Sequence, residues 1–325
     1  MALHFSMRFD FRNPAFAKTA MADRYAAALE MAEWAEANGC AGIGVAEHHG
    51  AEDGYIPSPI AVLAAMGART RTLRFTVGAL IAPFHDPLRI AEDFCVLDNL
   101  TRGRVDVIVA GGYVREEFAM FDVPMQERPK RVTEVVKTLK AAFAGEPFEF
   151  RGRMVKITPA PYRPGGPLVL MGGSTEAAAR RAARIGDGFV PPLVHLWDFY
   201  RDEVIRLGRA DPGPCPIGET EVTVLARDPE AGWRQMAPYF AYEMNAYGAW
   251  AEQDRLDSPY RRVTGTGDLQ ASGRYNILAP ETLVAKLKAM PRPQLALHPL
   301  CGGMPIELAW ESLRMLEREV LPAFR

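Results

Sequence analysis

Three titratable side chains stand together where an apolar run ends, at Glu47, His48 and His49. The preceding residues, 40–46, are apolar enough to form a buried strand, and Gly50 then turns the chain. Polar groups at the tip of a buried strand need partners or a task, and the C-terminal tips of parallel strands are where barrel enzymes build their active sites. We therefore predict that this segment lies at the mouth of a catalytic pocket.

The histidine pair offers an acid, a base or a metal ligand. Neighbouring residues on a strand point to opposite faces, and the sequence has no HxH or HExxH arrangement, so no metal site is predicted. Instead, we expect one imidazole to face the pocket while Glu47 holds the other. The alternative, that both imidazoles are structural, stays open at this point.

Two glycine-rich segments also follow predicted strands. Residues 111–113, Gly-Gly-Tyr, leave room for a flat ligand against the backbone, although such pairs usually form plain tight turns. Residues 172–175, Gly-Gly-Ser-Thr, precede a helix of small residues, with Ser174 expected as its N-cap. Free N–H groups at a helix start attract phosphate, so this segment is either an anion site or a simple cap. The charges of residues 116–117 are expected in a solvated loop.

Strand-like and helix-like patterns alternate along the whole chain, which positions these segments at strand ends. Eight such units predict a single (β/α)8 TIM barrel over residues 1–325, with a hairpin at 148–157 and a loop insertion at 251–277. A doubly wound sheet is the rival, but no GxGxxG opens an early helix. The expected strands are 3–10, 41–46, 73–81, 104–110, 167–171, 188–190, 221–226 and 294–298. The expected helices are 21–38, 59–70, 87–100, 130–144, 175–185, 195–207, 229–250, 280–290 and 305–320.

Composition narrows the class of protein. The 325 residues are 48% hydrophobic and 24% charged, with a net charge of -2 and no basic stripe, so neither nucleic acid nor a membrane surface is a predicted partner. No run approaches the roughly 20 apolar residues of a membrane span. Four widely spaced cysteines, without a metal-binding pattern, indicate reduced thiols of a cytoplasmic protein.

Taken in order, these segments make the chain resemble the luciferase-like monooxygenases, the flavin-dependent superfamily of bacterial luciferase. The resemblance is good over about residues 1–190 and is carried there by Val45–His49, Pro57–Pro59, Ala68–Thr70, Leu73–Gly78, Asp86–Glu92, Leu97–Arg104 and Gly112–Phe118. In the second half it rests on Gly172–Ser174, Ala183–Gly188 and Glu319–Pro322.

The resemblance implies a barrel that binds reduced FMN, or the deazaflavin F420 in some branches, at its C-terminal end. His48 would then be the general base, supported by His49 and Glu47. The turn at residues 79–81 would lie beneath the flavin ring, where the family often carries a non-proline cis peptide. The implied cofactor contacts are Gly78, Ala79, Leu80, Gly111, Gly112, Tyr113, Met171, Gly172, Gly173, Ser174 and Thr175.

One position departs from the family pattern. Luciferase has an arginine after its fourth strand that helps to hold the phosphate, whereas this chain has Gly111. Either another cation replaces it, with Arg115 as the nearby candidate, or the cofactor binds weakly and arrives from a separate flavin reductase.

The predicted function is oxygenation of a small organic substrate with reduced FMN and O2. F420-dependent hydride transfer on the same barrel is the first alternative, and a noncatalytic flavin-binding protein is the second. The resemblance also implies a homodimer formed through the helices predicted at 59–70 and 87–100. The substrate itself is not predicted.

Overall fold

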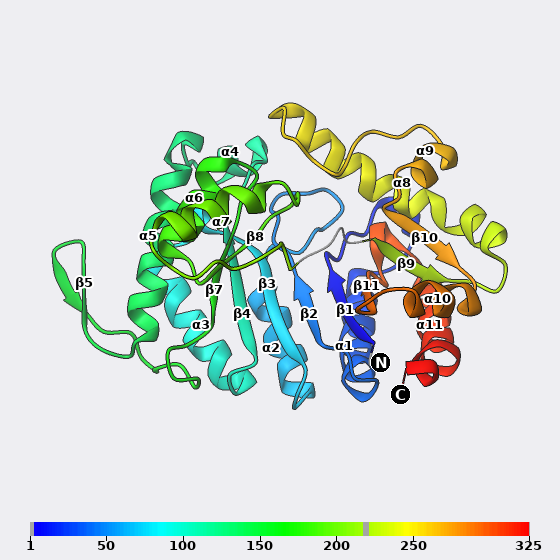
Figure 1. The fold of residues 1–325 in the computed structure, drawn as a ribbon, viewed down its shortest axis with the longest axis horizontal. Coiled ribbons are helices and arrows are strands. Elements are labelled where there is room, and N and C mark those ends of the chain that lie inside the picture. The colour runs from blue at the N-terminus through cyan, green and yellow to red at the C-terminus, as the bar shows by residue number, and fades with distance from the viewer. Residues whose placement is uncertain (1–2, 217–220, 325) are drawn as a thin grey trace.

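A parallel sheet of seven strands organises the computed structural model, which describes residues 3–216 and 221–324 (Figure 1). Each strand is joined to the next by a helical connection, as parallel pairing requires. Two further strands, β9 (Val222–Leu225) and β10 (Tyr275–Leu278), pair in parallel with one another, and β9 packs against β11. The seven-stranded order is β11 (Gln294–Leu297), β1 (His4–Phe9), β2 (Gly42–Val45), β3 (Arg74–Ile81), β4 (Val105–Ala110), β7 (Val169–Gly172) and β8 (Gly188–Val190).

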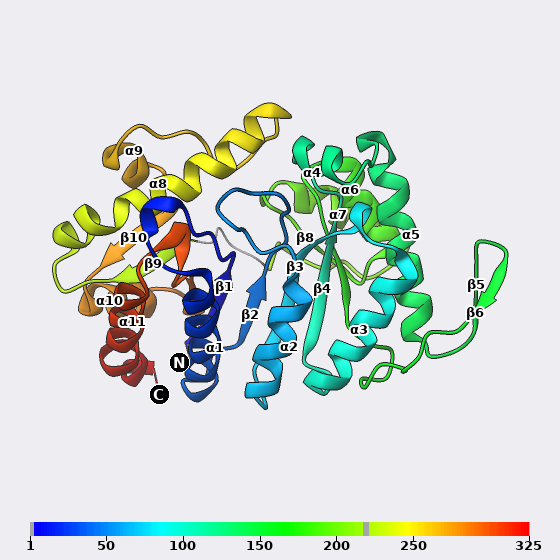
Figure 2. The same ribbon diagram turned by 180° about the vertical axis from the view of Figure 1, so that it is seen from behind.

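The helices cover one face of this curled sheet, and α1, α2 and α3 lie side by side against it (Figure 2). Several helices begin at a proline. The N–H groups of a first helical turn have no acceptor within the helix, so a proline, which has no N–H, costs nothing there. At the start of α3 the Asp86 carboxylate also accepts hydrogen bonds from the N–H groups of Leu88 and Arg89. The helices are α1 (Met21–Ala37), α2 (Pro59–Arg69), α3 (Pro87–Thr101), α4 (Arg115–Met120), α5 (Arg128–Phe143), α6 (Glu176–Ile185), α7 (Leu196–Arg206), α8 (Pro229–Gln253), α9 (Thr266–Ala271), α10 (Pro280–Lys288) and α11 (Ile306–Met315).

The two faces of the sheet differ in how they are filled. On β1 the side chains of Phe5, Met7 and Phe9 are buried toward the helices, where the Phe5 ring meets Trp34 of α1 at 6.3 Å. The alternate positions of the sheet face inward and are only partly buried. They are mostly small: Ser6, Gly42, Gly44, Thr76, Gly78, Ala110 and Gly172. Bulky residues normally fill a barrel interior, so these small side chains occupy less of the inner face than is usual for the fold.

The predicted parallel α/β architecture is confirmed. Among the described residues, however, the hydrogen-bonded sheet does not close into a complete barrel. Among the described residues, the hydrogen-bonded ladder ends at β8 on one side and at β11 on the other. The pair β9 and β10 stands beside this sheet and does not join its ladder. What the structure establishes is therefore a curled sheet of seven parallel strands.

The predicted loop insertion at 251–277 is wrong in its main feature. Helix α8 continues to Gln253, α9 follows, and β10 pairs with β9 in register. Tyr275 and Ile277 of β10 are buried, and the Tyr275 ring stacks on Phe240 of α8. The polar residues between α8 and β10 hid this short strand. The predicted hairpin is confirmed as β5 (Phe148–Phe150) and β6 (Arg153–Val155), which pair antiparallel.

The expectation of a solvated loop at residues 116–117 is also wrong. These residues lie in α4, where Glu117 and Phe118 are buried and Glu116 is exposed. Among the described residues, no helix is long and apolar enough to cross a membrane. Cys40, Cys95 and Cys301 are buried free thiols.

Candidate functional site

His48 follows β2 and is held by a carboxylate from a distant helix. Its Nδ1 lies 2.7 Å from Oε1 of Glu117, and the same oxygen accepts a hydrogen bond of 2.7 Å from the backbone N–H of His49. Both side chains are almost completely buried. Because Nδ1 is committed to Glu117, Nε2 is the nitrogen that remains free for chemistry.

Aromatic rings enclose the His48 imidazole. Tyr55, Tyr113 and Tyr247 meet it edge to face, with centroids 4.8, 5.8 and 6.1 Å away, and Trp250 lies tilted at 4.6 Å. Tyr55 and Tyr247 also share a hydrogen bond of 2.7 Å between their hydroxyls. With these rings around it, the His48 side chain is only 8% exposed, and the imidazole is restricted in how it can turn.

Glu47 holds the second imidazole of the pair. Its Oε1 lies 2.8 Å from Nε2 of His49 and 2.7 Å from Nε2 of His85, while Oε2 accepts a hydrogen bond of 2.7 Å from the Ile81 N–H. Burial alone would raise the pKa of Glu47. Hydrogen bonds from His49, His85 and Ile81 have the larger combined effect and lower this pKa to about 2. The ionised carboxylate therefore ties the end of β2 to the end of β3.

The turn at the end of β3 has an irregular backbone. The Gly78-Ala79 peptide is cis, and the pairing with β4 shifts register between Gly78 and Leu80. This bond joins Gly78 to Ala79, the first residue of the segment 79–81 where the family resemblance places a cis peptide. The Leu80 side chain is fully buried in the core, so only its backbone is available to a ligand.

The turn after β4 approaches β3 closely at Gly112. This residue has φ +69°, and a Cβ placed there would lie 2.7 Å from Cγ2 of Ile81, so only glycine fits. At Gly111 a Cβ would have room, with Cβ of Arg128 at 3.7 Å. Tyr113 then places its ring against His48. The predicted site segments after β2 and β4 therefore come together in space.

The turn after β7 is similarly tight. A Cβ on Gly173 would lie 2.5 Å from Cβ of Ala178, which forces a glycine where the strand meets α6. The predicted N-cap is corrected by one residue, because Oγ1 of Thr175, not that of Ser174, accepts from the Ala178 N–H at 3.2 Å. Met171 faces the helices and is buried in the core, so its side chain does not reach this turn.

The cation nearest Gly111 is Arg128 and not Arg115. The Arg115 Nε donates a hydrogen bond of 2.7 Å to Asp254 at the end of α8, and its side chain is largely exposed. Arg128 donates from Nη1 to the Gly112 carbonyl at 3.0 Å and from Nε to the Met125 carbonyl at 3.0 Å. Arg128 is thus the positive group that supports the glycine turn.

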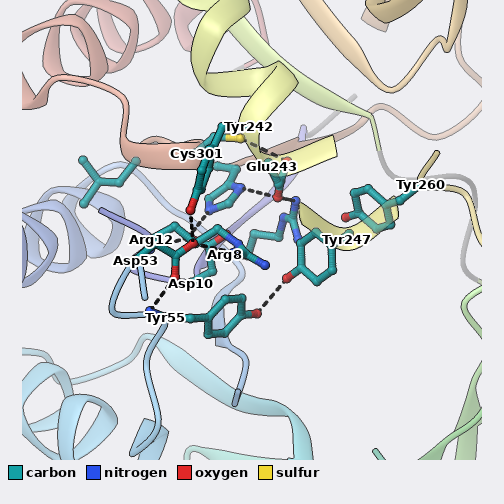
Figure 3. A network of polar contacts seen from close by, with 12 residues as sticks. Arg8, Asp10, Arg12, Asp53, Tyr55, Tyr242, Glu243, Tyr247, Tyr260 and Cys301 are labelled. Atoms are coloured by element: carbon teal, nitrogen blue, oxygen red, sulfur yellow. Dashed lines mark hydrogen bonds and ion pairs between the residues drawn. The ribbon is translucent and has the colours of Figure 1, made fainter. Parts of the chain in front are cut away.

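A buried charge network lies beside the aromatic rings, and the sequence analysis did not predict it (Figure 3). Nη1 of Arg12 pairs with Oδ2 of Asp53 at 2.5 Å. The Arg12 guanidinium lies 4.7 to 4.8 Å from the ring centroids of Tyr55, Tyr247 and Trp250. Charges repeated at positions 8, 10 and 12 were the available signal, since alternate residues share one face of a strand.

His298 completes this network between two carboxylates. Its Nε2 lies 3.4 Å from Oδ1 of Asp10, and its Nδ1 lies 3.3 Å from Oε1 of Glu243. Burial alone would lower the pKa of His298, but the Asp10 carboxylate and then Glu243 outweigh burial and raise it. No role for this histidine could be predicted from the sequence, because its partners come from the residue after β1 and from α8.

Glu243, His298 and Cys301 form the one group of potential metal ligands in the described parts of the chain, with ligand atoms within 4.8 Å of one another. Both Glu243 oxygens already accept hydrogen bonds, Oε1 from Arg8 at 2.5 Å and Oε2 from Tyr275 and Cys301. A guanidinium this close repels a cation, so the network fits charge pairing better than a metal.

Comparison with known proteins gives a consistent picture. A family model described as luciferase-like monooxygenase matches residues 3–284. The oxygenase component of a flavin-dependent trigonelline monooxygenase from Acinetobacter baylyi is 26% identical over 328 residues, 91% of this chain and 89% of that protein. An uncharacterized Mycobacterium tuberculosis protein is 36% identical over 132 residues, so the match spans 39% of this chain and 45% of that protein.

Solved structures share the fold. Monooxygenase RslO1 from Streptomyces bottropensis covers 99% of this chain and all of its own, with a TM-score of 0.78 and 24% identity. The oxygenating constituent of 3,6-diketocamphane monooxygenase from Pseudomonas putida, solved with FMN, gives 0.74 at 15% identity, covering 99% and 98%. An F420-dependent secondary alcohol dehydrogenase gives 0.72 at 14% identity over both whole chains. At these identities the likeness shows the fold alone.

Proposed function

The chain belongs to the luciferase-like monooxygenase family, and we propose from this premise that it uses reduced FMN and O2 to oxygenate a small organic substrate. The observation that carries the proposal is the His48–Glu117 pair within its aromatic enclosure. Tyr113, which follows the glycine pair after β4, lies against this imidazole. A free imidazole nitrogen in such a place is suited to proton transfer.

The residues at the strand ends fit a flavin phosphate and ring. Gly112 and Gly173 stand where a Cβ would collide with neighbouring side chains, so the backbone can be approached closely. In the first turn of α6 the N–H groups of Glu176 and Ala177 have no helical acceptor, which suits a phosphate beside Ser174. The inward Gly44 and Gly78 leave room for a planar ring. Bound reduced flavin would supply the electrons that activate O2.

Each side chain of the site then has a defined task. Nε2 of His48 takes a proton from the substrate, while Glu117 fixes Nδ1 and stabilises the imidazolium that results. Tyr55, Tyr247 and Trp250 keep water away from the reacting atoms. Glu47, ionised, holds His49 and the β3 turn in place. Glu47 and His49 are positioning residues in this scheme.

A separate flavin reductase is the proposed partner. One relative, matched over 91% of this chain, is named as the oxygenase component of a flavin-dependent monooxygenase. At the turn after β4, Arg128 already donates hydrogen bonds to two backbone carbonyls, so it has fewer free donors for a phosphate than an unpaired arginine would have. Loose binding of FMN suits an enzyme that receives its cofactor already reduced.

F420-dependent hydride transfer remains the alternative, because an F420-dependent dehydrogenase shares the fold over its whole length. Flavin binding without catalysis is the other. Titrating the protein with reduced FMN and with reduced F420, by fluorescence quenching, separates the cofactors. Under the proposal, reduced FMN binds, and O2 is consumed with oxygenation of substrate. Tight binding of F420 with no response to FMN would contradict it, and flavin binding without any turnover would favour the noncatalytic alternative.

We also propose that the protein is a homodimer through α2 and α3. The outer face of α2 presents Ala61, Ala65 and Ala68 at helical spacing, all exposed. On the adjacent α3, Val96 and Leu100 are 45% and 53% exposed. Small residues allow close approach of helices, and the exposed apolar side chains favour their burial in an interface.

A further inference from the structure

Arg8 is the accessible cation of the buried charge network. It occupies an inward position near the C-terminal end of β1, and 37% of its side-chain surface is exposed, whereas the side chain of its partner Glu243 is 0% exposed. Asp10 and Asp53 are buried as well. The carboxylates therefore lie behind the guanidinium, and the part of the network that meets an incoming ligand is positive.

The donors of Arg8 are only partly used. Nη2 pairs with Oε1 of Glu243 at 2.5 Å, and among the described residues no other acceptor binds its guanidinium (Figure 3). A guanidinium has five N–H donors in a planar fork that matches two oxygens of a carboxylate. By contrast, Arg12 is buried under three rings and cannot be reached in the same way.

The charges of the network balance without a ligand. Arg8 and Arg12 face three carboxylates, Asp10, Asp53 and Glu243, and the raised pKa of His298 favours a third positive charge there. An anion that binds Arg8 is thus not opposed by an excess of negative charge. It would also replace water at a cation whose remaining donors have no protein acceptor in the described chain.

Aromatic side chains connect this cation to the proposed base. The Tyr247 ring stacks on Tyr260 with centroids 4.4 Å apart, and its other contacts include the His48 ring at 6.1 Å. Tyr260, Tyr113 and Trp250 are only partly buried, so their rings are available to a flat ligand. Tyr247 is thus a neighbour of both His48 and Arg8.

We propose that Arg8 binds the carboxylate of an aromatic acid, and that this acid is the substrate class of the enzyme. The inference rests on the proposed function, since it places the carboxylate at Arg8 and the reacting ring toward Nε2 of His48. A planar oxyanion could also come from the cofactor, because the pyrimidine edge of reduced flavin carries negative charge. The experiment therefore tests the two sources separately.

Benzoate and benzamide are the probes, since they have the same shape and differ in charge. Each is titrated by calorimetry into the cofactor-free protein and into protein saturated with FMN. We expect benzoate to bind at least tenfold more tightly than benzamide. Replacing Arg8 alone would leave the buried Glu243 carboxylate without its counter-charge and would destabilise the fold. The main variant is therefore the double substitution Arg8→Met with Glu243→Gln. Circular dichroism verifies that it folds.

The double variant should bind benzoate at least tenfold more weakly than the wild type and bind benzamide unchanged. Arg153→Gln, on the exposed hairpin strand β6, is the matched control and should change neither. Wild-type affinity for benzoate in the folded double variant would overturn the proposal. So would a loss of affinity for reduced FMN with benzoate binding intact, which would assign Arg8 to the flavin. Failure of the wild type to bind any reduced flavin would contradict the proposed function instead. The benzoate titration into cofactor-free protein does not depend on that result.

Discussion

The two adjacent histidines, His48 and His49, are each bound by a different glutamate. Glu117 holds Nδ1 of His48, and Glu47 holds Nε2 of His49 together with His85. Nε2 of His48 therefore has no carboxylate partner among the described residues, whereas Nε2 of His49 is paired with Glu47. The proposed chemistry at the residue scale therefore depends on Glu117 as much as on the histidine that it orients.

Removing the base and its partner should not be additive. His48→Ala is expected to lower kcat about 100-fold, the usual loss when a general base is removed. Glu117→Ala should lower kcat because the imidazole loses its orientation, yet the double variant should be no slower than His48→Ala, since Glu117 acts only through His48. Single-turnover rates of all three variants measure this coupling.

Glu116→Ala is the control, because Glu116 lies on the same helix but is exposed and bonds Gln253. It should leave kcat near the wild-type value. If the double variant lost kcat by the product of the two single-variant factors, Glu117 would act independently of His48.

The depressed pKa of Glu47 predicts acid sensitivity of a defined sign. Its folded pKa is about 2 against an ordinary value of 4.5, so the ionised carboxylate stabilises the fold above pH 4.5 and this contribution is lost as pH falls toward 2. The difference corresponds to about 3 kcal/mol. Glu47→Gln should be less stable than the wild type at pH 7, and the gap should narrow toward pH 2.

Denaturant unfolding between pH 2 and pH 7 measures this gap. Glu33→Gln, which removes a half-exposed glutamate of α1, should follow the wild-type profile throughout. A gap between E47Q and wild type that stays constant with pH would show that ionisation of Glu47 does not stabilise the fold.

At the scale of elements, short turns between strand and helix prepare the proposed cofactor site. The turns after β4 and β7 each hold a glycine with positive φ, Gly112 and Gly173, at which a Cβ would collide with a neighbouring side chain. At the turn after β7 the backbone lies close to the following helix, because a Cβ on Gly173 would overlap Ala178 of α6. The start of α6 can therefore present its N–H groups only when residue 173 is glycine.

Gly173→Ala should weaken FMN binding through the phosphate. In the wild type, FMN should bind more tightly than riboflavin, which lacks the phosphate, and the added methyl should displace the α6 start and abolish this difference. Fluorescence titrations with both flavins measure it. Gly267→Ala in α9, where a Cβ meets nothing within 4 Å, is the matched control. A G173A protein that still prefers FMN would place the phosphate elsewhere.

At the scale of the whole molecule, the helices that cover β2 and β3 present an exposed apolar stripe to solvent. Ala61, Ala65 and Ala68 of α2 are exposed, and Leu100 of the neighbouring α3 is exposed as well. The proposed active site opens at the strand ends. A second copy bound along α2 and α3 would therefore complete an apolar surface of the fold.

The dimer proposal predicts a change in mass. Sedimentation velocity at micromolar concentration should give a dimer for the wild type and a monomer for Leu100→Glu, because the carboxylate would be buried without a partner. Leu207→Glu, at an exposed leucine after α7, should remain dimeric. A monomeric wild type would refute the proposal.

The sequence by itself determined the features that neighbouring residues encode. Alternating periodicity located the strands and helices of the seven-stranded sheet, and the charged tip at Glu47, His48 and His49 marked the end at which they meet. The tight turns at Gly112 and Gly173 were visible for the same reason, since turn chemistry is local. The short β10 was missed because its four residues carry too little periodicity.

Only the tertiary structure decided which groups become partners. Glu117 lies 69 residues from His48, and Glu243 lies 235 residues from Arg8, yet each pair is in direct contact. A buried charge takes whatever counter-charge the folded chain brings to it, and no local pattern specifies that group. The charge network, the partly exposed Arg8 and the placement of α4 therefore emerged from packing between distant segments.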